Sequence, residues 1–245
     1  MNYEKAEVIP IVESHIFEDT DAQLAIAEVK PDELANMAEF IGAAELRAKT
    51  YVANGFVKET ELNDDGTELD ADDERSIHYL VFERTAVRSL ARVVGNMRLV
   101  MKTAENPNPL PVERFFPEYF QESAPNGSAE VSRLIARHED ARMQALIKWP
   151  MFIAGYKQVV ESESGPVYGL MTPGLIRQLS SQHVPMSVLA EAEYIEEINA
   201  TKQPVEIDLP ALGRLISATG DYDINISGGG VSYVDFEKSI KGDAA

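Results

Sequence analysis

Apolar residues recur at near-helical spacing in four segments of the chain. The first segment follows Pro31-Asp32-Glu33, a proline and two acids typical of a first helical turn, and it continues to Tyr51, shortly before Asn54-Gly55. The longest segment covers residues 141–160, and Pro150 is expected to kink the helix that it forms. Shorter helices are predicted at residues 173–182 and 210–217.

Runs rich in β-branched and aromatic residues predict the strands. They cover residues 77–83, 92–102, 129–136 and 167–171, with weaker runs at 187–195 and 205–207. Gly95 is expected at a bulge or a close backbone approach, and glycines 228–230 indicate a flexible break. The segment 110–120, aromatic-rich and bounded by prolines, is predicted as a short helix or a pocket wall. The alternation of strands and helices predicts an α/β (α+β) fold with a mixed central β-sheet.

The chain divides into one large domain and two flanking segments. Residues 1–30 are acidic and weakly patterned and are assigned to an N-terminal leader, residues 31–215 to the domain, and residues 216–245 to a C-terminal extension. A chain of 245 residues that is 44% hydrophobic is long enough to bury a sizeable core in one domain.

Composition and charge exclude several classes of function. The net charge of −19 is expected to repel nucleic acid and anionic membrane surfaces. No apolar run reaches the roughly 18 to 20 residues of a membrane span, and the start of the chain lacks the pattern of a secretory signal. There is no cysteine for a disulfide, a nucleophile or a thiolate metal site. His138 beside Glu139 and Asp140 lacks a second histidine at ligand spacing, so no metal site is expected. These features predict a cytoplasmic enzyme.

Candidate chemistry concentrates in residues 64–73, DDGTELDADD, which we call the acidic loop. It carries an E-x-D-x-x-D pattern immediately before a predicted strand. An acidic run of this kind is commonly a solvated loop. Here, however, three arginines stand in strand and helix contexts around it, in LRAKTY, VVGNMRL and EVSRL. The residues concerned are Glu68, Asp70 and Asp73 of the loop, Arg47, Arg98 and Arg133, and a fourth carboxylate, Glu130. We therefore predict that they meet in an ion cluster inside a cleft.

These motifs resemble the acyl-homoserine-lactone (autoinducer) synthases, a variant of the GNAT acyltransferase fold. In that family a helical arginine precedes an aromatic residue and a Gly-Trp pair, and Arg47, Tyr51 and Gly55-Phe56 resemble this set, with Phe in place of Trp. The family's acidic loop, its V-V-G-x-x-R-L strand and its E-x-S-R strand match, in order, residues 68–73, residues 93–99 and the segment that holds Glu130, Ser132 and Arg133. Asp72 departs from the pattern, since the family carries an aromatic residue in that loop.

The resemblance implies a GNAT-like mixed sheet flanked by helices and an N-acyltransferase activity. The enzyme would move a fatty acyl chain from acyl carrier protein to a small primary amine, with no further cofactor. The family's amine is S-adenosylmethionine, which gives an acyl-homoserine lactone. Relatives of the same fold acylate free amino acids, and this second acceptor stays open because the aromatic residues of the amine pocket differ. A non-catalytic relative that binds an acyl group or an amino acid is the alternative of another class.

The same resemblance distributes roles among the residues. Glu130 and Asp70 are expected to handle protons, since a carboxylate can take a proton from an attacking ammonium directly or through water. The substrate-binding set comprises Arg47, Tyr51, Phe56, Glu68, Asp73, Arg98, Ser132 and Arg133. The alternative is that the cluster only clamps the acidic loop and performs no chemistry.

The expected acyl donor follows from a missing motif. Most GNAT enzymes hold the pyrophosphate of coenzyme A at a glycine-rich turn that opens a helix. Residues 137–142, RHEDAR, have no glycine there and two added acids, which favours a carrier-protein donor. Basic residues for docking that carrier are Arg137, Arg142, Lys148 and Lys157, unless these are scattered surface charges. Candidates for the acyl pocket are Met143, Leu146, Trp149, Phe152 and Met171, and for each of them a place in the core is the alternative.

Overall fold

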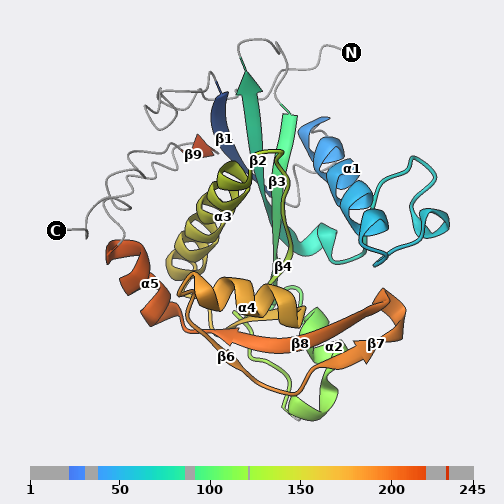
Figure 1. The fold of residues 1–245 in the computed structure, drawn as a ribbon. Coiled ribbons are helices and arrows are strands. Elements are labelled where there is room, and N and C mark those ends of the chain that lie inside the picture. Colours follow the sequence, from blue (N-terminus) through green and yellow to red (C-terminus); the bar gives the residue numbers. More distant parts are fainter. Residues whose placement is uncertain (1–21, 31–37, 86–91, 121, 219–229, 232–245) are drawn as a thin grey trace.

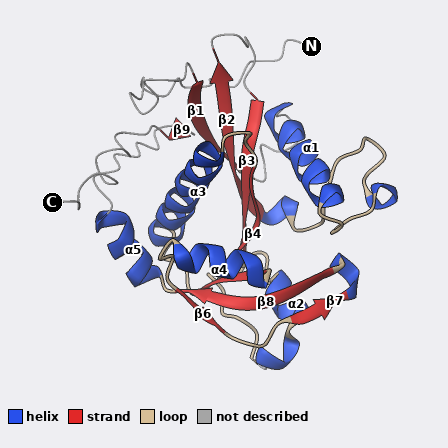
Figure 2. Cartoon of the chain, viewed as in Figure 1, coloured by secondary structure: helices blue, strands red, loops and turns tan. Residues whose placement is uncertain are grey.

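The computed structural model describes residues 22–30, 38–85, 92–120, 122–218 and 230–231 (Figure 1). The strands within them are β1 (Ala22–Val29), β2 (Ser76–Thr85), β3 (Arg92–Met101), β4 (Ala129–Ala136), β5 (Val167–Met171), β6 (Met186–Val188), β7 (Glu193–Ile195), β8 (Ala200–Ile207) and β9 (Gly230–Val231). The α-helices are α1 (Ala38–Ala53), α2 (Pro111–Phe115), α3 (Ala141–Glu161), α4 (Pro173–Ser181) and α5 (Leu209–Ala218) (Figure 2).

The strands form one mixed sheet in the order β6-β8-β5-β4-β3-β2-β1-β9, with β7 paired to β8 beside this path. All described pairs are antiparallel except β4 with β5. That parallel ladder runs only from Ala129 opposite Val167 to Val131 opposite Gly169, although β4 continues to Ala136. The predicted α/β class with a mixed central sheet is confirmed, and the sheet divides into two halves where β4 leaves β5.

Alternation along β2 explains why helices cover both faces of the sheet. Ile77, Tyr79 and Val81 belong to the main hydrophobic core, while Leu80 and Phe82 belong to a second cluster on the other face. Successive side chains of a strand point to opposite faces, so a strand with apolar residues on both faces needs a cover on each side. Helix α3 supplies the first cover and α1 the second, and Figure 1 shows the two helices on opposite sides of β2 and β3.

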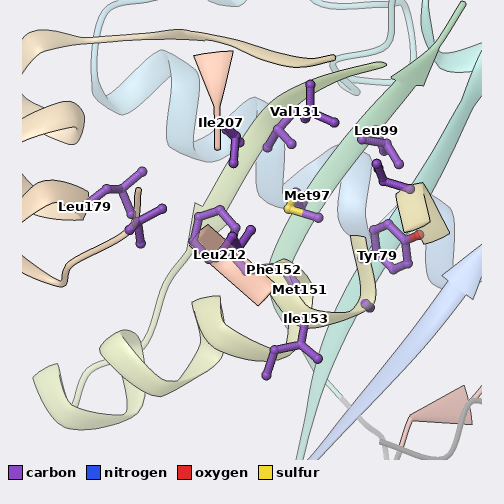
Figure 3. Close-up of a cluster of buried hydrophobic side chains, with 14 of the residues drawn as sticks. Tyr79, Met97, Leu99, Val131, Met151, Phe152, Ile153, Leu179, Ile207 and Leu212 are labelled. Carbon is purple, nitrogen blue, oxygen red and sulfur yellow. The ribbon is translucent and has the colours of Figure 1, made fainter. Parts of the chain in front are cut away.

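The main core lies between α3 and the sheet and continues under α4 and α5 (Figure 3). Met151, Phe152 and Ile153 of α3 are buried there together with Leu179 of α4 and Leu212 of α5. Helix α3 continues through Pro150 as a single element, although a proline has no N–H to give to the helical hydrogen-bond ladder. Burial of α3 residues on more than one side supplies the stability that this missing hydrogen bond removes.

Several elements differ from their prediction. Strand β1 lies inside the segment assigned to the leader and pairs with β2 along its whole length, so residues 22–29 are part of the sheet. Its sequence, AQLAIAEV, is rich in alanine, which has low strand propensity, so the strand depends on its pairing with β2. Gly230 pairs with Ala27 of β1 in β9, although a flexible break was predicted there. The predicted helix start at Pro31 and most of the C-terminal extension lie outside the described residues.

The edge formed by β6, β7 and β8 also differs. The single strand predicted at residues 187–195 is two strands, which both pair with β8. Strand β8 starts at Ala200, five residues before its predicted start. Asn199, with φ 45°, occupies the left-handed region that asparagine tolerates, and it reverses the chain between β7 and β8. Asn199 therefore marks the reversal between β7 and β8, while residues 189–192 separate β6 from β7.

Gly95 stands at a close backbone approach, as predicted. A Cβ atom at this position would lie 2.5 Å from Ile147 Cγ2 and 3.1 Å from Val81 Cβ. The register between β2 and β3 shifts at the same place, between Val81 and Phe82. The absence of a side chain at residue 95 thus allows α3 to pack directly on β3.

We expect Gly95→Ala to lower the free energy of unfolding by about 1–3 kcal/mol, because the added methyl group overpacks the contact with Ile147. The matched control is Gly174→Ala in α4, where the nearest atoms to an added Cβ lie 3.9 and 4.0 Å away. That control should be neutral or raise stability by up to about 1 kcal/mol. Urea denaturation of both variants measures the difference, and equal effects would contradict the close approach.

Candidate active site

Arg47 of α1 ties the acidic loop to the helix. Its side chain is 0% exposed, and its Nε atom donates to Glu68 Oε2 at 2.6 Å. Its Nη1 and Nη2 atoms donate to Asp73 Oδ1 and Oδ2 at 2.7 and 3.1 Å, a bidentate geometry that fixes the carboxylate in one orientation. Both carboxylates raise the pKa of Arg47 against the opposing effect of its burial. The guanidinium therefore stays charged and holds both ends of the loop.

Arg98 of β3 joins the same loop to the sheet. Its Nη1 atom donates to Asp70 Oδ1 at 2.5 Å and to Asp73 Oδ1 at 3.0 Å. Its Nε atom donates to Ser132 Oγ on the neighbouring strand β4 at 2.9 Å. Burial alone would raise the pKa of Asp73, but the guanidiniums of Arg47 and Arg98 hold it well below its usual value. Asp73 is thus an anion shared by a helix and a strand.

Arg133 reaches the loop because β4 is irregular at this residue. The register between β3 and β4 shifts between Asn96 and Arg98, and Arg133 has φ 53°, a strained value for a residue with a side chain. The side chain of Asn96 donates to the Arg133 carbonyl at 3.0 Å and so satisfies a backbone group that the bulge has displaced. The bulge directs the guanidinium to Glu68 Oε1 and Asp70 Oδ2, at 2.7 and 2.6 Å.

The predicted convergence of charges is therefore present. Three guanidiniums from α1, β3 and β4 meet three carboxylates of one loop, and we call this set the arginine clamp: Arg47, Arg98, Arg133, Glu68, Asp70 and Asp73. His78 lies beside it, fully buried, with its ring edge-on to Phe40, and burial lowers its pKa to about 4. Asp70 is the most exposed carboxylate of the clamp, at 34% of its side chain. Asp70 and the partly exposed Arg133 are thus the members of the clamp within reach of a ligand.

Glu130 lies next to the arginine clamp but forms no hydrogen bond or salt bridge with its described members. Its residue is 1% exposed, and its Oε2 atom accepts a hydrogen bond from the backbone N–H of Val112 in α2 at 2.7 Å. Burial raises its pKa to about 7, against the opposing effects of that hydrogen bond and of the Arg98 cation. A carboxyl group that titrates near neutral pH without an ion-pair partner among the described residues has the properties of a general base.

A second ion network, which we did not predict, connects the acidic loop to α2. Asp72 Oδ1 accepts from Arg75 Nη2 and Asp72 Oδ2 from Arg114 Nη2, each at 2.6 Å. Arg75 also donates to the backbone carbonyls of Asn108 and Pro109, just before α2. Asp72 stands where the resembling family has an aromatic residue, so this position carries ion pairs with Arg75 and Arg114 in place of an aromatic ring. Two features of the sequence could have predicted this network: the acidic Asp72 in place of an aromatic residue, and Arg114 in the predicted pocket wall.

Tyr51 in the last turn of α1 and Phe56 in the loop after it form an aromatic pair beside the arginine clamp, which we call the aromatic wall. The rings of Tyr51 and Phe56 meet edge to face at 5.8 Å, and the Arg133 guanidinium lies 5.2 Å from the centre of the Tyr51 ring. The Phe56 ring is covered by Lys202 of β8, whose Nζ atom is 5.2 Å from the ring centre. Lys202 was not predicted as a site residue, because β8 was predicted to start only at residue 205.

The predicted acyl-pocket residues lie in or against the core. Met143, Phe152 and Met171 are buried, and the partly buried Trp149 packs edge to face on Phe152 at 6.4 Å. The side chain of Leu146 lies outside the described residues. A cavity of about 380 Å³ is lined by other residues, including Tyr168 and Glu206. An acyl-binding role for the predicted residues remains a prediction.

The predicted docking residues do not form one basic surface. Lys148 is 8% exposed, and burial lowers its pKa, so it cannot present a charge to a protein partner and its predicted docking role is wrong. Helical periodicity places it on the core side of α3, beside Ile147 and Met151. Arg137 is exposed and Lys157 half-buried, while the side chain of Arg142 lies outside the described residues.

No described helix combines the length and the apolar character that crossing a membrane requires. No group of histidine and acidic residues with the arrangement of a metal site occurs among the described residues.

Comparison with known proteins bears on the fold. A model of the acetyltransferase (GNAT) domain matches residues 46–149, and no curated protein sequence matches the chain. Solved structures that resemble it include BjaI, a CoA-dependent acyl-homoserine lactone synthase with SAM and isopentyl-CoA, at 18% identity over 80% of this chain and 89% of that one, with a TM-score of 0.58. The AHL synthase LasI matches at 15% identity, 78% and 91% coverage, and a TM-score of 0.54.

FeeM, an N-acyl amino acid synthase from uncultured soil microbes, matches at 13% identity over 77% of this chain and 93% of that one, with a TM-score of 0.51. The chain has the GNAT fold of the autoinducer synthases. The predicted fold resemblance is confirmed. In this GNAT fold, the arginine clamp and Glu130 lie on the face of the sheet that carries α1 and α2, opposite the α3 core.

We expect Arg47→Leu to lower the free energy of unfolding by about 3–5 kcal/mol. The substitution removes one of the two guanidiniums that each of the buried carboxylates Glu68 and Asp73 contacts. The matched control is Lys49→Leu in the same helix, which removes only an exposed pair with Glu45. Its effect should stay within about 0.5 kcal/mol. Denaturant unfolding decides the point, since similar small losses in both variants would show that the clamp does not hold the loop.

Proposed function

We propose that this protein is an N-acyltransferase that moves a fatty acyl chain from a thioester to a small primary amine. The observation that carries the proposal is Glu130, a buried carboxyl group next to the arginine clamp that titrates near neutral pH. The GNAT domain model and the autoinducer-synthase fold support the reaction class. Glu130 belongs to β4 of the sheet, and such a fixed position would suit a group that must act at a constant distance from the amine.

In the reaction, the acceptor enters as an ammonium ion and must lose a proton before its nitrogen can attack. Glu130 takes this proton directly or through one water molecule, a step that contributes roughly 10²–10⁴-fold to the rate in enzymes. The nitrogen then attacks the thioester carbonyl, the C–N bond forms and the C–S bond breaks. The nitrogen loses a second proton to become the amide, and the leaving thiolate takes up that proton to become a thiol. Backbone N–H groups of β4 beyond Val131, where its described ladder with β5 stops, are placed to stabilise the oxyanion.

The two predicted catalytic acids have different environments. Asp70 is bound by both Arg98 and Arg133, so each of its two carboxylate oxygens is already engaged by a guanidinium. It is partly exposed and suits a role in holding the ammonium group. Arg47, Asp73 and Arg98 lie deeper and act by fixing the loop that carries Asp70.

We assign the acyl donor to a carrier protein. In the GNAT fold, the pyrophosphate of coenzyme A binds backbone N–H groups at the start of a helix. At the start of α3, the Asp140 carboxylate already accepts from the Met143 N–H at 3.3 Å, and Glu139 adds a second negative charge. An anionic pyrophosphate is disfavoured beside these acids, whereas a carrier protein brings its pantetheine arm without one. Assays with acyl-carrier protein and acyl-CoA side by side test the assignment.

Two molecules are candidates for the amine acceptor, and one alternative to the enzymatic activity stays open. The motif resemblance favours S-adenosylmethionine, and BjaI was solved with SAM. FeeM, an N-acyl amino acid synthase of the same fold, supports a free amino acid. A catalytically silent relative would keep the clamp without turnover. Mass spectrometry of lipid extracts from expressing cells distinguishes acyl-homoserine lactones, acyl amino acids and neither, and the last result contradicts the proposed function.

Because Glu130 must be ionised to accept a proton, we expect kcat/KM to rise with pH and level off above about pH 7. Glu130→Gln should lower kcat/KM at least about 10²-fold and remove this inflection. Asp70→Asn serves as the comparison, since it should reduce activity but keep the inflection. A folded Glu130→Gln enzyme with a normal rate or an unchanged pH profile would exclude Glu130 as the base.

The same group gives a prediction that does not depend on turnover. Its folded pKa lies above the unfolded value, so its contribution to stability is complete at acidic pH and is lost as pH rises through about 7. Replacing Glu130 by Gln should therefore flatten the fall in unfolding free energy between about pH 4.5 and 7. Urea unfolding at a series of pH values measures it, and parallel curves for both proteins would contradict the buried environment of Glu130.

A further inference from the structure

Lys202 of β8 is a half-buried cation with no carboxylate partner. Its ammonium group covers the Phe56 ring at 5.2 Å, and within the described residues it forms no hydrogen bond and no ion pair. Every guanidinium of the arginine clamp, in contrast, contacts at least two carboxylate oxygens. Removing an ammonium from water without a counterion is unfavourable. The lysine is therefore a site for an anionic group of a ligand.

The position of Lys202 is fixed by the hairpin that carries it. Asn199, at the turn between β7 and β8, donates from Nδ2 to the Gly55 carbonyl at 2.6 Å, and Tyr194 donates to Asn199 Oδ1 at 2.5 Å. These bonds fasten the hairpin to the loop after α1, next to Phe56. The ammonium is thus held at the aromatic wall before any ligand arrives, which reduces the entropic cost of binding.

The aromatic wall is already occupied by cations of the protein. Arg133 lies over Tyr51 and Lys202 over Phe56, each at 5.2 Å. A sulfonium ligand would need such ring faces, because a cation is attracted by the negative face of an aromatic ring. Here a sulfonium would meet two like charges in place of open rings, and like charges at close range reject a ligand. This wall therefore selects against S-adenosylmethionine.

The charges around the site divide into two sides. Asp70 and Glu130 supply the acidic side, and Lys202, beside Arg133, supplies the basic side. Arg133 is engaged by Glu68 and Asp70, whereas Lys202 forms no salt bridge among the described residues. Burial and the Arg133 cation lower the pKa of Lys202 to about 8, and the Glu130 carboxyl only partly offsets them, so an anionic ligand group would stabilise the charged lysine. A ligand that carries one ammonium and one carboxylate complements both sides. A free amino acid and S-adenosylmethionine both carry these groups, and S-adenosylmethionine differs by its sulfonium, which would meet the cations on the aromatic wall.

We propose that Lys202 binds the carboxylate of a free amino acid whose ammonium faces Asp70 and Glu130. This inference rests on the proposed N-acyltransferase function and names its acceptor class. Lys202 is a specificity-determining residue: it selects an amino acid over S-adenosylmethionine and over amines without a carboxylate.

The test compares acceptors and variants with one acyl-carrier-protein donor. The acceptors are leucine, phenylalanine and tyrosine, the carboxamide of each, and S-adenosylmethionine. For the wild-type protein we expect kcat/KM to be at least about 10-fold higher for each amino acid than for its amide and for S-adenosylmethionine. Lys202→Met should abolish this preference, mainly by raising KM for the amino acids and with little change for the amides. Lys202→Arg should restore part of it, and Lys49→Met, at an exposed lysine of α1, should leave it unchanged.

Three results overturn the inference: a wild-type preference for S-adenosylmethionine, equal rates with acids and amides, or a Lys202→Met variant that keeps the preference. If the wild type acylates no amine, the proposed function fails, and calorimetric titration with the same amino acids decides the role of Lys202 by itself. Binding to the wild type that is at least about 10-fold weaker in Lys202→Met supports the carboxylate site. Absence of binding, or equal binding to both proteins, overturns it.

Discussion

The site depends on one buried carboxylate, that of Asp73. Its two oxygens accept from Arg47 in α1 and Arg98 in β3, and also from the backbone N–H of Asp70 at 2.7 Å. A buried ion pair often stabilises a protein no more than apolar residues of the same size would. Its specific effect is geometric, since any other conformation of the acidic loop would leave two guanidiniums buried without their anion. The carboxylate thereby selects one loop conformation and joins a helix to the sheet.

Asp73 is the first link in a series of contacts that ends at Glu130. Beside it in sequence, Asp72 pairs with Arg75 and Arg114, and Arg75 binds the carbonyls that precede α2. Helix α2 in turn presents the Val112 N–H to Glu130. The acidic loop thus carries the partly exposed Asp70 and, through Asp72, also holds helix α2, which donates the hydrogen bond to Glu130. A change in the loop would alter both, although loop and base lie far apart in sequence.

Charged motifs were predictable from the sequence because their residue types and spacing are distinctive. Arg47, the E-x-D-x-x-D pattern and Arg98 stand in the structure as their motifs indicated. Elements that depend on tertiary pairing were not predictable: the alanine-rich β1 has little strand propensity of its own, and the polar start of β8 after Asn199 is a strand through its pairing with β7 and β5. Lys202 shows the same limit, because its proximity to Phe56 arises from a hairpin that packs across 144 residues of sequence separation.

The core residues that stabilise the fold and the residues proposed to select the acceptor lie on opposite faces of the sheet. On the α3 face, closely packed side chains such as Met151 and Ile153 define the core, and a change there alters stability first. On the α1 face, Tyr51 comes from the last turn of α1, Phe56 from the loop after it, and Lys202 from the start of β8, outside the core cluster that holds Val205 and Ile207 of the same strand. Such residues can change charge while the fold stays intact, which is how one scaffold can serve a lactone synthase and an amino acid synthase. In our proposal the acceptor is selected by the charge of Lys202 in the β7–β8 hairpin, and the arginine clamp holds the acidic groups that complement that charge.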